Sequence, residues 1–499
     1  MLKRILVANR GEIAIRIMRA AKELEIESVA IFHEIEKKAH YIHFADYSIE
    51  IKGTSPKSSF LDIEQIISIA KEIRADAIHP GYGFLSENAN LARRCEEEGI
   101  KFIGPYSRSI ETMGSKTKAR EIMANAGVPI VPGTKEPIQD INQAKKIANE
   151  IGYPILLKAS AGGGGKGMRD VSNEEEFEQN FESAQREALK AFGDDSIYIE
   201  KLIENPKHIE IQIIADEYGN YVYLGERDCS IQRRHQKLIE ECPSTVLDPI
   251  KREEMGKVAI AAAKAVNYVN AGTIEFLFDT NRNFYFLEMN TRLQVEHPVT
   301  ELVTRIDLVK EQILVASGMP LSFTQDEIPF CGHAIECRIN AEDVFNDFLP
   351  DTGKILFIQE PDGNGVRIDS GIALNSEISV HFDPMLAKLI SFGKNRKEAI
   401  EKMTRALKNF IIQGVKTNIP FHLSVMKNQK FIDGTFDTDF IEKDFDFESM
   451  NWIDEKELEM LAAILAFHII EVEKNKIPVK TESKLASWKE QQLITRRLI

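Results

Sequence analysis

Short apolar runs alternate with an amphipathic stretch in the first part of the chain. Apolar runs of strand length lie at residues 4–8, 28–32, 77–79 and 101–103, and residues 13–24 have helical periodicity. Apolar positions that recur every three to four residues predict a helix, whereas short β-branched runs predict strands. Strands that alternate with helices predict a doubly wound α/β domain with a parallel sheet.

The turn after the first predicted strand, residues 9–12, contains only one glycine, Gly11. A dinucleotide fingerprint needs three glycines in a G-x-G-x-x-G pattern. Gly81 and Gly83, which follow the third strand, fit a tight turn instead. We therefore expect a Rossmann-like domain that does not bind NAD.

A glycine-rich loop follows the apolar run at 154–158. Residues 159–167 read ASAGGGGKG, and backbone N–H groups without side chains can approach phosphate oxygens closely. A P-loop requires Ser or Thr after its lysine, but Gly167 follows Lys166 here. The pattern favours phosphate contact of another kind over a flexible linker.

The stretch from Asn270 to Glu301 contains a predicted β-hairpin. Residues 273–278 and 284–289 are rich in β-branched and aromatic residues, and a polar loop separates them. If the loop is centred between Asn281 and Arg282, Glu275 lies directly opposite Glu288, and Asn290 shares their face. Opposed carboxylates repel, so the arrangement indicates a divalent cation between two carboxylates and an amide oxygen. The alternative is an ordinary exposed hairpin with scattered acids.

Two polar patterns precede this hairpin. His208, Glu210 and Gln212 alternate with apolar residues, which predicts a half-buried strand whose polar face points to water. A basic cluster follows within residues 226–243, comprising Arg227, Arg233, Arg234, His235 and Lys237. Such a cluster is most often a solvated surface. Because it lies between a nucleotide loop and a metal hairpin, it is also a candidate site for phosphate or carboxylate.

Alternation continues after the hairpin with Arg292, Gln294 and Glu296. A guanidinium, an amide and a base close to a metal indicate a second, anionic substrate. Further on, residues 334–339 form a predicted strand with Glu336 and Arg338 on one face. Predicted β segments at 362–371 and 383–390 and a helix at 396–409 follow.

Composition places the chain among ordinary globular proteins of several domains. It has 499 residues, of which 43% are hydrophobic and 28% charged. A net charge of −15 without a long basic run argues against nucleic acid as the main partner. Five scattered cysteines give neither a disulfide scaffold nor a zinc site. The N-terminus is not a signal peptide, and residues 462–470 are too few to span a membrane, so we expect a cytoplasmic protein.

Five segments together resemble the biotin carboxylases, which are the ATP-grasp components of biotin-dependent carboxylases. They are residues 9–20, 79–88, 158–168, 226–241 and 288–301. The resemblance runs from Met1 to about Phe447. It implies an α/β and α+β fold with a Rossmann-like domain (1–113) and an ATP-grasp domain (114–330) that has a mobile glycine-rich lid at about 131–203. A mixed α/β C-terminal domain (331–447) and a helical, basic tail (448–499) would follow.

The resemblance also implies roles for individual residues. Those that match the family's ATP contacts are Lys116, Lys158, Gly164, Gly165, Glu200, Lys201, Leu202, Ile203, His208, Gln232, His235, Glu275, Leu277 and Glu288. Those that match its magnesium (or manganese) ligands are Glu275, Glu288 and Asn290, in agreement with the hairpin argument. Those that match the bicarbonate and biotin site are Lys237, Arg292, Gln294, Val295, Arg338 and Asp383. Lys237, Arg292, Glu296 and Arg338 are expected to be catalytic, with Glu296 as the general base.

The implied reaction is ATP-dependent carboxylation of biotin by bicarbonate through carboxyphosphate. Two mild departures from the family pattern occur: Lys166 stands where arginine is common, and His381-Phe382 precedes Asp383 in place of the usual aromatic pair. Met426-Lys427 lacks the context of a biotinylation site and is interpreted as coincidence. The biotin carrier and the carboxyltransferase are therefore expected to be other chains, and the resemblance implies a homodimer.

The tail after about Phe447 lies outside the resemblance. A predicted helix at 458–473 has a strongly apolar face, and residues 474–499 contain seven Lys or Arg against two Glu. It fits equally well a docking element for a carboxyltransferase or a helix packed on its own domain with a frayed end.

Pyruvate carboxylase is favoured as the holoenzyme over acetyl-CoA carboxylase. The competing functions are another ATP-grasp ligase and a non-catalytic assembly scaffold. The basic cluster and the segment that follows the hairpin favour a biotin carboxylase over another ATP-grasp ligase. A non-catalytic scaffold has no need for an intact set of catalytic and metal-binding residues, which are Lys237, Glu275, Glu288, Arg292, Glu296 and Arg338.

Overall fold

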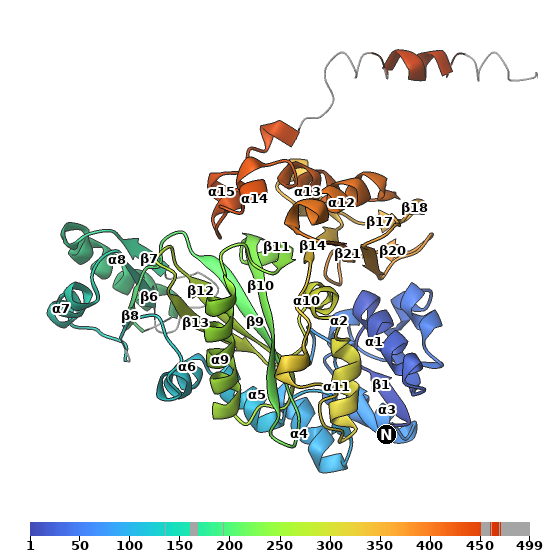
Figure 1. Ribbon diagram of the computed structural model, residues 1–499, viewed down its shortest axis with the longest axis horizontal. Coiled ribbons are helices and arrows are strands. Elements are labelled where there is room, and N and C mark those ends of the chain that lie inside the picture. Colours follow the sequence, from blue (N-terminus) through green and yellow to red (C-terminus); the bar gives the residue numbers. More distant parts are fainter. Residues whose placement is uncertain are drawn as a thin grey trace, which may run out of the picture. The chain divides into compact units, whose positions relative to one another are not determined.

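The computed structural model describes residues 1–134, 136–159, 168–192, 194–450, 460, 462–468 and 470. The chain divides into two compact units, Met1–Phe445 and Asp446–Ile499. All elements described below belong to the first unit unless stated (Figure 1). None of the helices in the described ranges combines the length and the apolar character needed to span a bilayer.

The N-terminal sheet is parallel, with strand order β3-β2-β1-β4-β5. Its strands are β1 (Arg4–Val7), β2 (Glu27–His33), β3 (Tyr47–Ile51), β4 (Ala77–His79) and β5 (Lys101–Phe102). Ile5 and Val7 of β1 belong to the core that contains α1 (Gly11–Glu23), whereas Leu6 belongs to the core of α3 (Ile63–Glu72) and α4 (Ala89–Glu98). Helices therefore cover both faces, which confirms the predicted Rossmann-like arrangement.

The central sheet has eight strands in the order β13-β12-β9-β10-β11-β14-β21-β19. They are β9 (Lys207–Ala215), β10 (Tyr221–Arg233), β11 (Gln236–Cys242), β12 (Asn270–Phe278), β13 (Phe284–Asn290), β14 (His333–Asn340), β19 (Val366–Ser370) and β21 (Met385–Gly393). The pairs β11–β14, β14–β21 and β19–β21 are antiparallel. The sheet thus continues across the domain boundary expected at residues 330–331.

One face of β9 packs on α9 (Pro249–Ala265) and α6 (Lys116–Asn125) through Ile209, Ile211 and Ile213. The other face carries His208, Glu210 and Gln212, and all nine residues of the strand are buried. The prediction that this polar face points to water is therefore wrong. Arg227 and Lys237 pair with Glu210, so the polar face is satisfied inside the protein.

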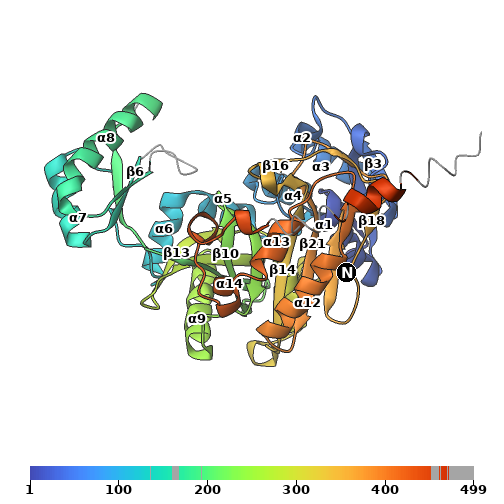
Figure 2. The same cartoon turned by 90° about the horizontal axis from the view of Figure 1, so that it is seen from above.

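A three-stranded sheet in the order β7-β6-β8 forms a separate layer with two helices (Figure 2). Its elements are β6 (Ile155–Ala159), β7 (Met168–Val171), β8 (Ile197–Lys201), α7 (Ile141–Ile151) and α8 (Glu174–Phe192). They share a core of their own. The predicted phosphate loop, including Gly164, Gly165 and Lys166, lies outside the described residues.

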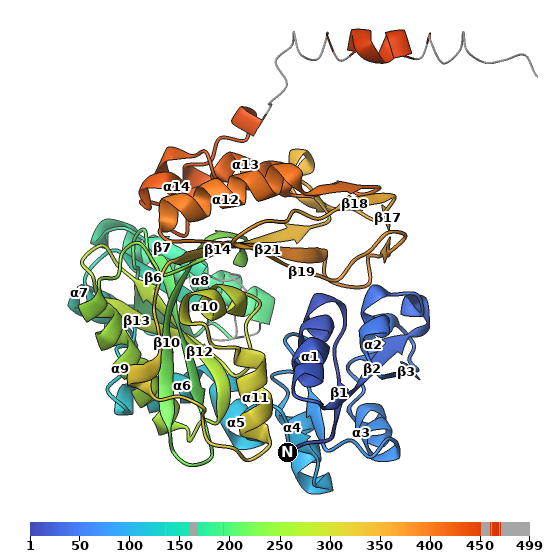
Figure 3. The ribbon, with the colours of Figure 1, turned by 45° about the vertical axis from the view of Figure 1, so that its right-hand side comes forward.

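Helices α10 (His297–Thr304) and α11 (Leu308–Ala316) precede β14 in the chain. The last part of the first unit begins at β14. Helix α12 (Arg396–Asn409) packs on β14 and β21, and α13 (Ile419–Val425), α14 (Gln429–Asp433) and α15 (Phe440–Lys443) follow it (Figure 3). In the second unit, the predicted helix at 458–473 is described only at residues 460, 462–468 and 470. These residues are helical and exposed.

Candidate active site

A cavity of about 2590 Å³ lies where the N-terminal sheet, the three-stranded sheet, the central sheet and the β21 segment approach one another. Of the predicted nucleotide residues, its lining includes Lys116, Lys158, Glu200, Lys201, Leu202, Ile203, His208, Gln232, His235, Glu275, Leu277 and Glu288. Of the predicted bicarbonate, biotin and metal residues, it includes Lys237, Asn290, Arg292, Gln294, Val295, Arg338 and Asp383. One cavity therefore brings together predicted residues that are far apart in the sequence.

The β12–β13 hairpin places Glu275 directly opposite Glu288, as the sequence predicts. Next to the loop, however, the strand pairing differs by one residue from the predicted register, because Phe278 pairs with Phe284. A β-bulge between Glu275 and Phe276 shifts the register back by one. The predicted pair is therefore confirmed, although the sequence pattern does not indicate the bulge that produces it.

Lys237 of β11 is the central cation of the site. Its Nζ lies 2.6 Å from Glu210 Oε2, 2.8 Å from Glu275 Oε1 and 2.7 Å from Glu296 Oε1. Burial disfavours the ammonium ion, but the surrounding anions outweigh burial and hold the pKa of Lys237 well above its ordinary value. Lys237 is charged at neutral pH and neutralises acids that come from three segments of the chain.

Glu296 is fully buried immediately before α10, and it does not itself line the cavity but contacts Lys237 and Arg338, which do. Its Oε2 accepts a hydrogen bond of 2.9 Å from Arg338 Nη2, while Oε1 faces Lys237. Burial would raise the pKa of Glu296, but Lys237 and then Arg338 lower it well below the ordinary value. Glu296 is therefore ionised, as a proton acceptor must be.

Arg338 of β14 also donates through Nε to Glu240 Oε1 at 2.6 Å. Glu240 lies on the neighbouring strand β11, directly opposite Glu336. Burial raises the pKa of Glu240 to about 7. Arg338 thus reaches the cavity while anchored to acids from two other elements.

Arg292 lies in the segment after β13, which is a loop and not the continued strand that the alternation predicts. Its Nε donates to Glu87 Oε2 at 3.0 Å, and its Nη1 donates to Gln294 Oε1 at 3.0 Å. Glu87 Oε1 also accepts from the backbone N–H of Thr291 at 3.0 Å. Glu87 lies in the matching segment 79–88, but the resemblance assigns it no role in the site.

The nucleotide side of the cavity contains a second ion-pair group. Glu200 of β8 pairs with Lys158 of β6 and with Arg120 of α6, and Arg120 Nη2 also donates to Val131 O at 3.1 Å. Attraction to Lys158 and Arg120 outweighs burial, so the pKa of Glu200 is lowered. Arg120 is another residue that the sequence pattern does not indicate, because its partner lies 80 residues away.

The basic cluster of residues 226–243 divides between different places. Arg227 is fully buried and pairs with Glu210, with Gln212 as a further acceptor. Arg233 and Arg234 both pair with Asp347. Arg234, His235 and Lys237 line the cavity. Only part of the cluster is thus available to an anionic ligand.

The donor set of Glu275, Glu288 and Asn290 fits a hard divalent cation. Burial, and then the negative charge of Glu275, raise the pKa of Glu288. A bound cation would lower this pKa again. Asn290 Nδ2 donates to Glu275 Oε1 at 2.8 Å, so the amide already lies against one of the two carboxylates. His208, Glu210 and Glu275 also cluster closely, but the Lys237 ammonium group contacts two of these three side chains. The first set is the better metal site.

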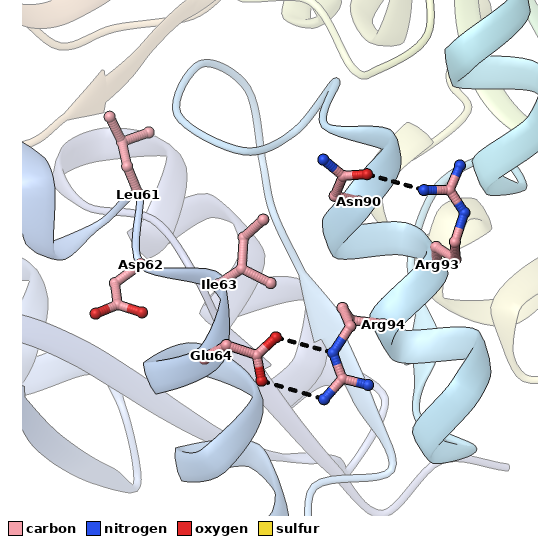
Figure 4. A pocket seen from close by; sticks show the side chains of 7 residues that line it. All are labelled: Leu61, Asp62, Ile63, Glu64, Asn90, Arg93 and Arg94. Carbon is pink, nitrogen blue, oxygen red and sulfur yellow. Dashed lines mark hydrogen bonds and ion pairs between the residues drawn. The ribbon is translucent and has the colours of Figure 1, made fainter.

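A second hollow of about 440 Å³ lies beside α3 and α4, lined by residues such as Asp62, Glu64, Asn90, Arg93 and Arg94 (Figure 4). Arg94 pairs with Glu64 through Nε at 2.9 Å, and Arg93 donates to Asn90 at 2.8 Å. Its arginines are already paired on an exposed surface, so it offers no cation for a ligand.

The chain is similar to known proteins over most of its length. Three family models match: "Biotin carboxylase, N-terminal domain" at residues 1–110, "Carbamoyl-phosphate synthase L chain, ATP binding domain" at 115–324, and "Biotin carboxylase C-terminal domain" at 336–443. A pyruvate carboxylase subunit of Methanothermobacter thermautotrophicus is 54% identical over 443 residues, which cover 89% of this chain and 90% of that protein.

Pyruvate carboxylase of Staphylococcus aureus is 48% identical over 506 residues, which cover 98% of this chain and 44% of that protein. A solved structure from Hydrogenobacter thermophilus, the dimer of the biotin carboxylase domain of 2-oxoglutarate carboxylase with MgADP, ADP and bicarbonate, matches with a TM-score of 0.81 and 51% identity. The match covers 89% of this chain and 98% of that one.

Proposed function

Since the chain belongs to the biotin carboxylase family and is an ATP-dependent ligase, we propose that it carboxylates biotin carried on a separate protein, with bicarbonate as the carboxyl donor. The observation that carries the proposal is that Lys237 and Arg338, which line one cavity, both contact the ionised carboxylate of Glu296. Glu296 is thereby placed between a group suited to an anionic substrate and a group that can face biotin.

The nucleotide would occupy the side of the cavity formed by the three-stranded sheet and the hairpin. Lys116, Lys158, His208, Gln232 and His235 would contact phosphates and ribose, together with Gly164 and Gly165 of the loop. Glu200 to Ile203 and Leu277 would contact the adenine. Glu275, Glu288 and Asn290 would hold Mg²⁺ or Mn²⁺, which when bound neutralises charge on the transferred phosphoryl group. The match to a structure with MgADP supports this assignment.

Bicarbonate would bind among Lys237, Arg292, Gln294 and Val295. Glu296 would accept the bicarbonate proton, and a bicarbonate oxygen would attack the γ-phosphorus as ADP leaves. The resulting carboxyphosphate would break down to carbon dioxide and phosphate. Closure of the expected lid at about 131–203 over this site would exclude water, which would otherwise hydrolyse the intermediate.

Biotin would approach from the side of Arg338 and Asp383. The released phosphate would take the proton from the ureido nitrogen, which then attacks carbon dioxide. Arg338 would stabilise the negative charge that develops on the ureido oxygen, because its guanidinium already reaches the cavity. The domain limits that accompany this proposal are 1–113, 114–330 and 331–447, with a tail at 448–499.

We favour pyruvate as the final carboxyl acceptor. The archaeal pyruvate carboxylase subunit supports this choice, and the S. aureus pyruvate carboxylase match extends over 98% of the chain, whereas the other two matches extend over 89%. An acyl-CoA or 2-oxoglutarate is the alternative, since a relative acts in 2-oxoglutarate carboxylase. A biotin carrier and a carboxyltransferase would be the partners. A homodimer is proposed because the solved relative is a dimer.

The deciding experiment is ATP hydrolysis by the purified chain with magnesium and bicarbonate, with and without free biotin. We expect ADP release that requires bicarbonate, is stimulated by biotin and is abolished by Glu296→Ala. Release that is indifferent to biotin would indicate another ATP-grasp ligase. Tight ATP binding without turnover would favour an assembly scaffold.

A further inference from the structure

Arg338 lies near the end of β14, where this strand loses one of its two neighbours. Pairing with β11 extends from Cys242 opposite Ala334 to Ile239 opposite Cys337, and goes no further. Pairing with β21 on the other side continues past Arg338. Beyond Cys337, the backbone N–H and C=O groups on this edge of β14 no longer face β11. Where they are buried, they must find other hydrogen-bond partners.

Asn418, the residue before α13, takes the place of the missing strand. Its side-chain Nδ2 donates to Arg338 O at 2.9 Å, and its Oδ1 accepts from the backbone N–H of Asn340 at 2.9 Å. Its own backbone N–H donates to Asn340 O at 3.2 Å. A carboxamide carries one acceptor and one donor group, as a peptide unit does. Asn418 is fully buried, so these contacts are shielded from water.

His422, one helical turn later, contacts the same carbonyl. Its Nε2 lies 2.8 Å from Arg338 O. Because a carbonyl oxygen only accepts, Nε2 must carry the hydrogen. Burial lowers the pKa of His422 to about 4, so the ring is neutral at physiological pH. The carbonyl of Arg338 is thus held by two buried side chains from one element.

This contact matters because the Arg338 side chain is held at its other end as well. Nε contacts Glu240 at 2.6 Å and Nη2 contacts Glu296 at 2.9 Å, and these acids belong to other elements. Both distances depend on where the backbone of residue 338 lies. A displacement of about 1 Å at a reacting group can cost on the order of a hundredfold in rate.

We propose that Asn418 and His422 are positioning residues for Arg338 in the carboxylation of biotin, because they complete the sheet where β11 ends. The proposal rests on the proposed function, which assigns Arg338 to the biotin half of the reaction. It predicts a selective defect: the step that involves biotin is slowed more than the steps that involve ATP and bicarbonate, because Lys237 still contacts Glu296 when Arg338 is displaced.

The test compares Asn418→Leu and His422→Leu with the unmodified chain in the ATP hydrolysis assay. We expect biotin-stimulated kcat to fall about tenfold or more, with KM for ATP and bicarbonate and the biotin-independent rate within about twofold. His422→Gln should restore most of the rate, since the Gln amide can donate from near the Nε2 position. His333→Leu is the matched control, because His333 is a buried histidine of β14 that pairs with Glu241 and does not contact Arg338.

Two further readouts separate positioning from a general loss of structure. In an Arg338→Gln background, His422→Leu should cause no additional loss of the biotin step, since both changes act through one group. Hydrogen exchange of the Asn340 amide should accelerate in Asn418→Leu, whatever the chain catalyses.

Each outcome bears on the proposal. If biotin stimulation survives both leucine variants, the positioning role is wrong. It is also wrong if these variants slow all steps equally, or if the control His333→Leu causes the same selective loss. If the unmodified chain shows no biotin stimulation at all, the proposed function fails and this role fails with it. The exchange result then reports separately on the sheet-completing contacts.

Discussion

At the scale of single residues, buried carboxyl groups of this chain differ in pKa according to their partners. Glu241 is buried, but Arg396 and His333 outweigh burial and lower its pKa to about 2. Glu336 is equally buried, and neither of its oxygens has a hydrogen-bond partner. Burial, together with Glu240 opposite, raises the pKa of Glu336 well above its ordinary value in spite of Lys388. Glu336 therefore favours its protonated form in the fold more strongly than an ordinary glutamate does.

Replacing these two acids should change stability in opposite directions. A raised pKa in the folded state means that folding takes up a proton, so stability falls as pH rises above the ordinary value of 4.5. Glu336→Gln should remove this cost and stabilise the fold by about 1–3 kcal/mol at pH 8, with little effect at pH 4. Urea unfolding at the two pH values measures the effect.

Glu241→Gln provides the contrast, because a lowered pKa stabilises the fold above pH 4.5 and the gain is lost as pH falls towards about 2. This variant should lose about 2–4 kcal/mol at pH 8, since Arg396 and His333 lose a buried partner. Destabilisation by both variants at pH 8 would show that Glu336 is ionised in the fold.

Glu87 is a second residue with a specific expected effect. It holds Arg292 and the backbone of Thr291, both close to the proposed bicarbonate site. Glu87→Gln should raise KM for bicarbonate about tenfold, because a charge-assisted hydrogen bond is weakened, and should leave KM for ATP unchanged. Glu111→Gln, which breaks the exposed pair with Arg93, should change neither value. An equal rise in both KM values for Glu87→Gln would argue against a local role.

At the scale of secondary structure, the sequence predicts elements well where periodicity is strong and local. The predicted helix at 396–409 and the strand at 77–79 have the observed bounds. The Glu275–Glu288 pair is also predicted, but the simple register behind that prediction fails near the loop, and an unpredicted β-bulge restores the pair. Strand β3 at the sheet edge is not predicted, although Tyr47, Ile49 and Ile51 alternate with polar residues as in a half-buried strand.

The errors arise where tertiary contacts decide. The polar side of β9 is buried by ion pairs with Arg227 and Lys237, which periodicity does not reveal. Glu87, Arg120, Asn418 and His422 escape prediction, since each meets its partner only after a separation of 80 residues or more. Motif resemblance identifies side chains that face the cavity. The residues that hold those side chains in place can be identified only when the fold is known.

The hairpin also allows a test of the proposed metal site. Glu288→Gln removes one of two opposed carboxylates, so Mg²⁺ should bind about tenfold or more weakly to the ADP-loaded chain. Asp279→Asn, in the loop of the same hairpin, is the matched control and should bind Mg²⁺ normally. Titration calorimetry measures binding without turnover, and chelation by EDTA should stop ATP hydrolysis. Unchanged Mg²⁺ affinity in Glu288→Gln would remove this residue from the ligand set.

At the scale of the whole molecule, the first unit contains all the described residues that line the proposed site. In the strand order of the central sheet, Glu275 and Glu288 lie on the strands at one end, and Arg338 lies on β14 toward the other end. The sheet therefore joins the ATP-grasp strands to the C-terminal strands. The proposed metal ligands Glu275 and Glu288 and the proposed biotin-facing Arg338 therefore share one continuous sheet, whereas Lys158 and Glu200 belong to the three-stranded sheet.

We propose that the second unit, Asp446–Ile499, contains a binding element for a partner protein. In its described helical residues, Met460, Ile464 and Phe467 follow the spacing of one helix face, and all three are exposed. A basic segment follows in the sequence. An exposed apolar face of this kind is suited to a groove on a protein partner, for which the carboxyltransferase is our candidate.

A chain that ends after Met450, whose side chain is buried, tests this role. Its ATP hydrolysis with free biotin should remain within about twofold of the full chain, since the described residues that line the cavity belong to the first unit. Its binding to the carboxyltransferase, measured by calorimetry with the purified subunit, should be lost. Phe467→Asp in the full chain should weaken binding strongly, whereas Ala466→Asp, on a neighbouring side of the helix, should weaken it less. Undiminished binding by the shortened chain would show that the partner docks on the first unit.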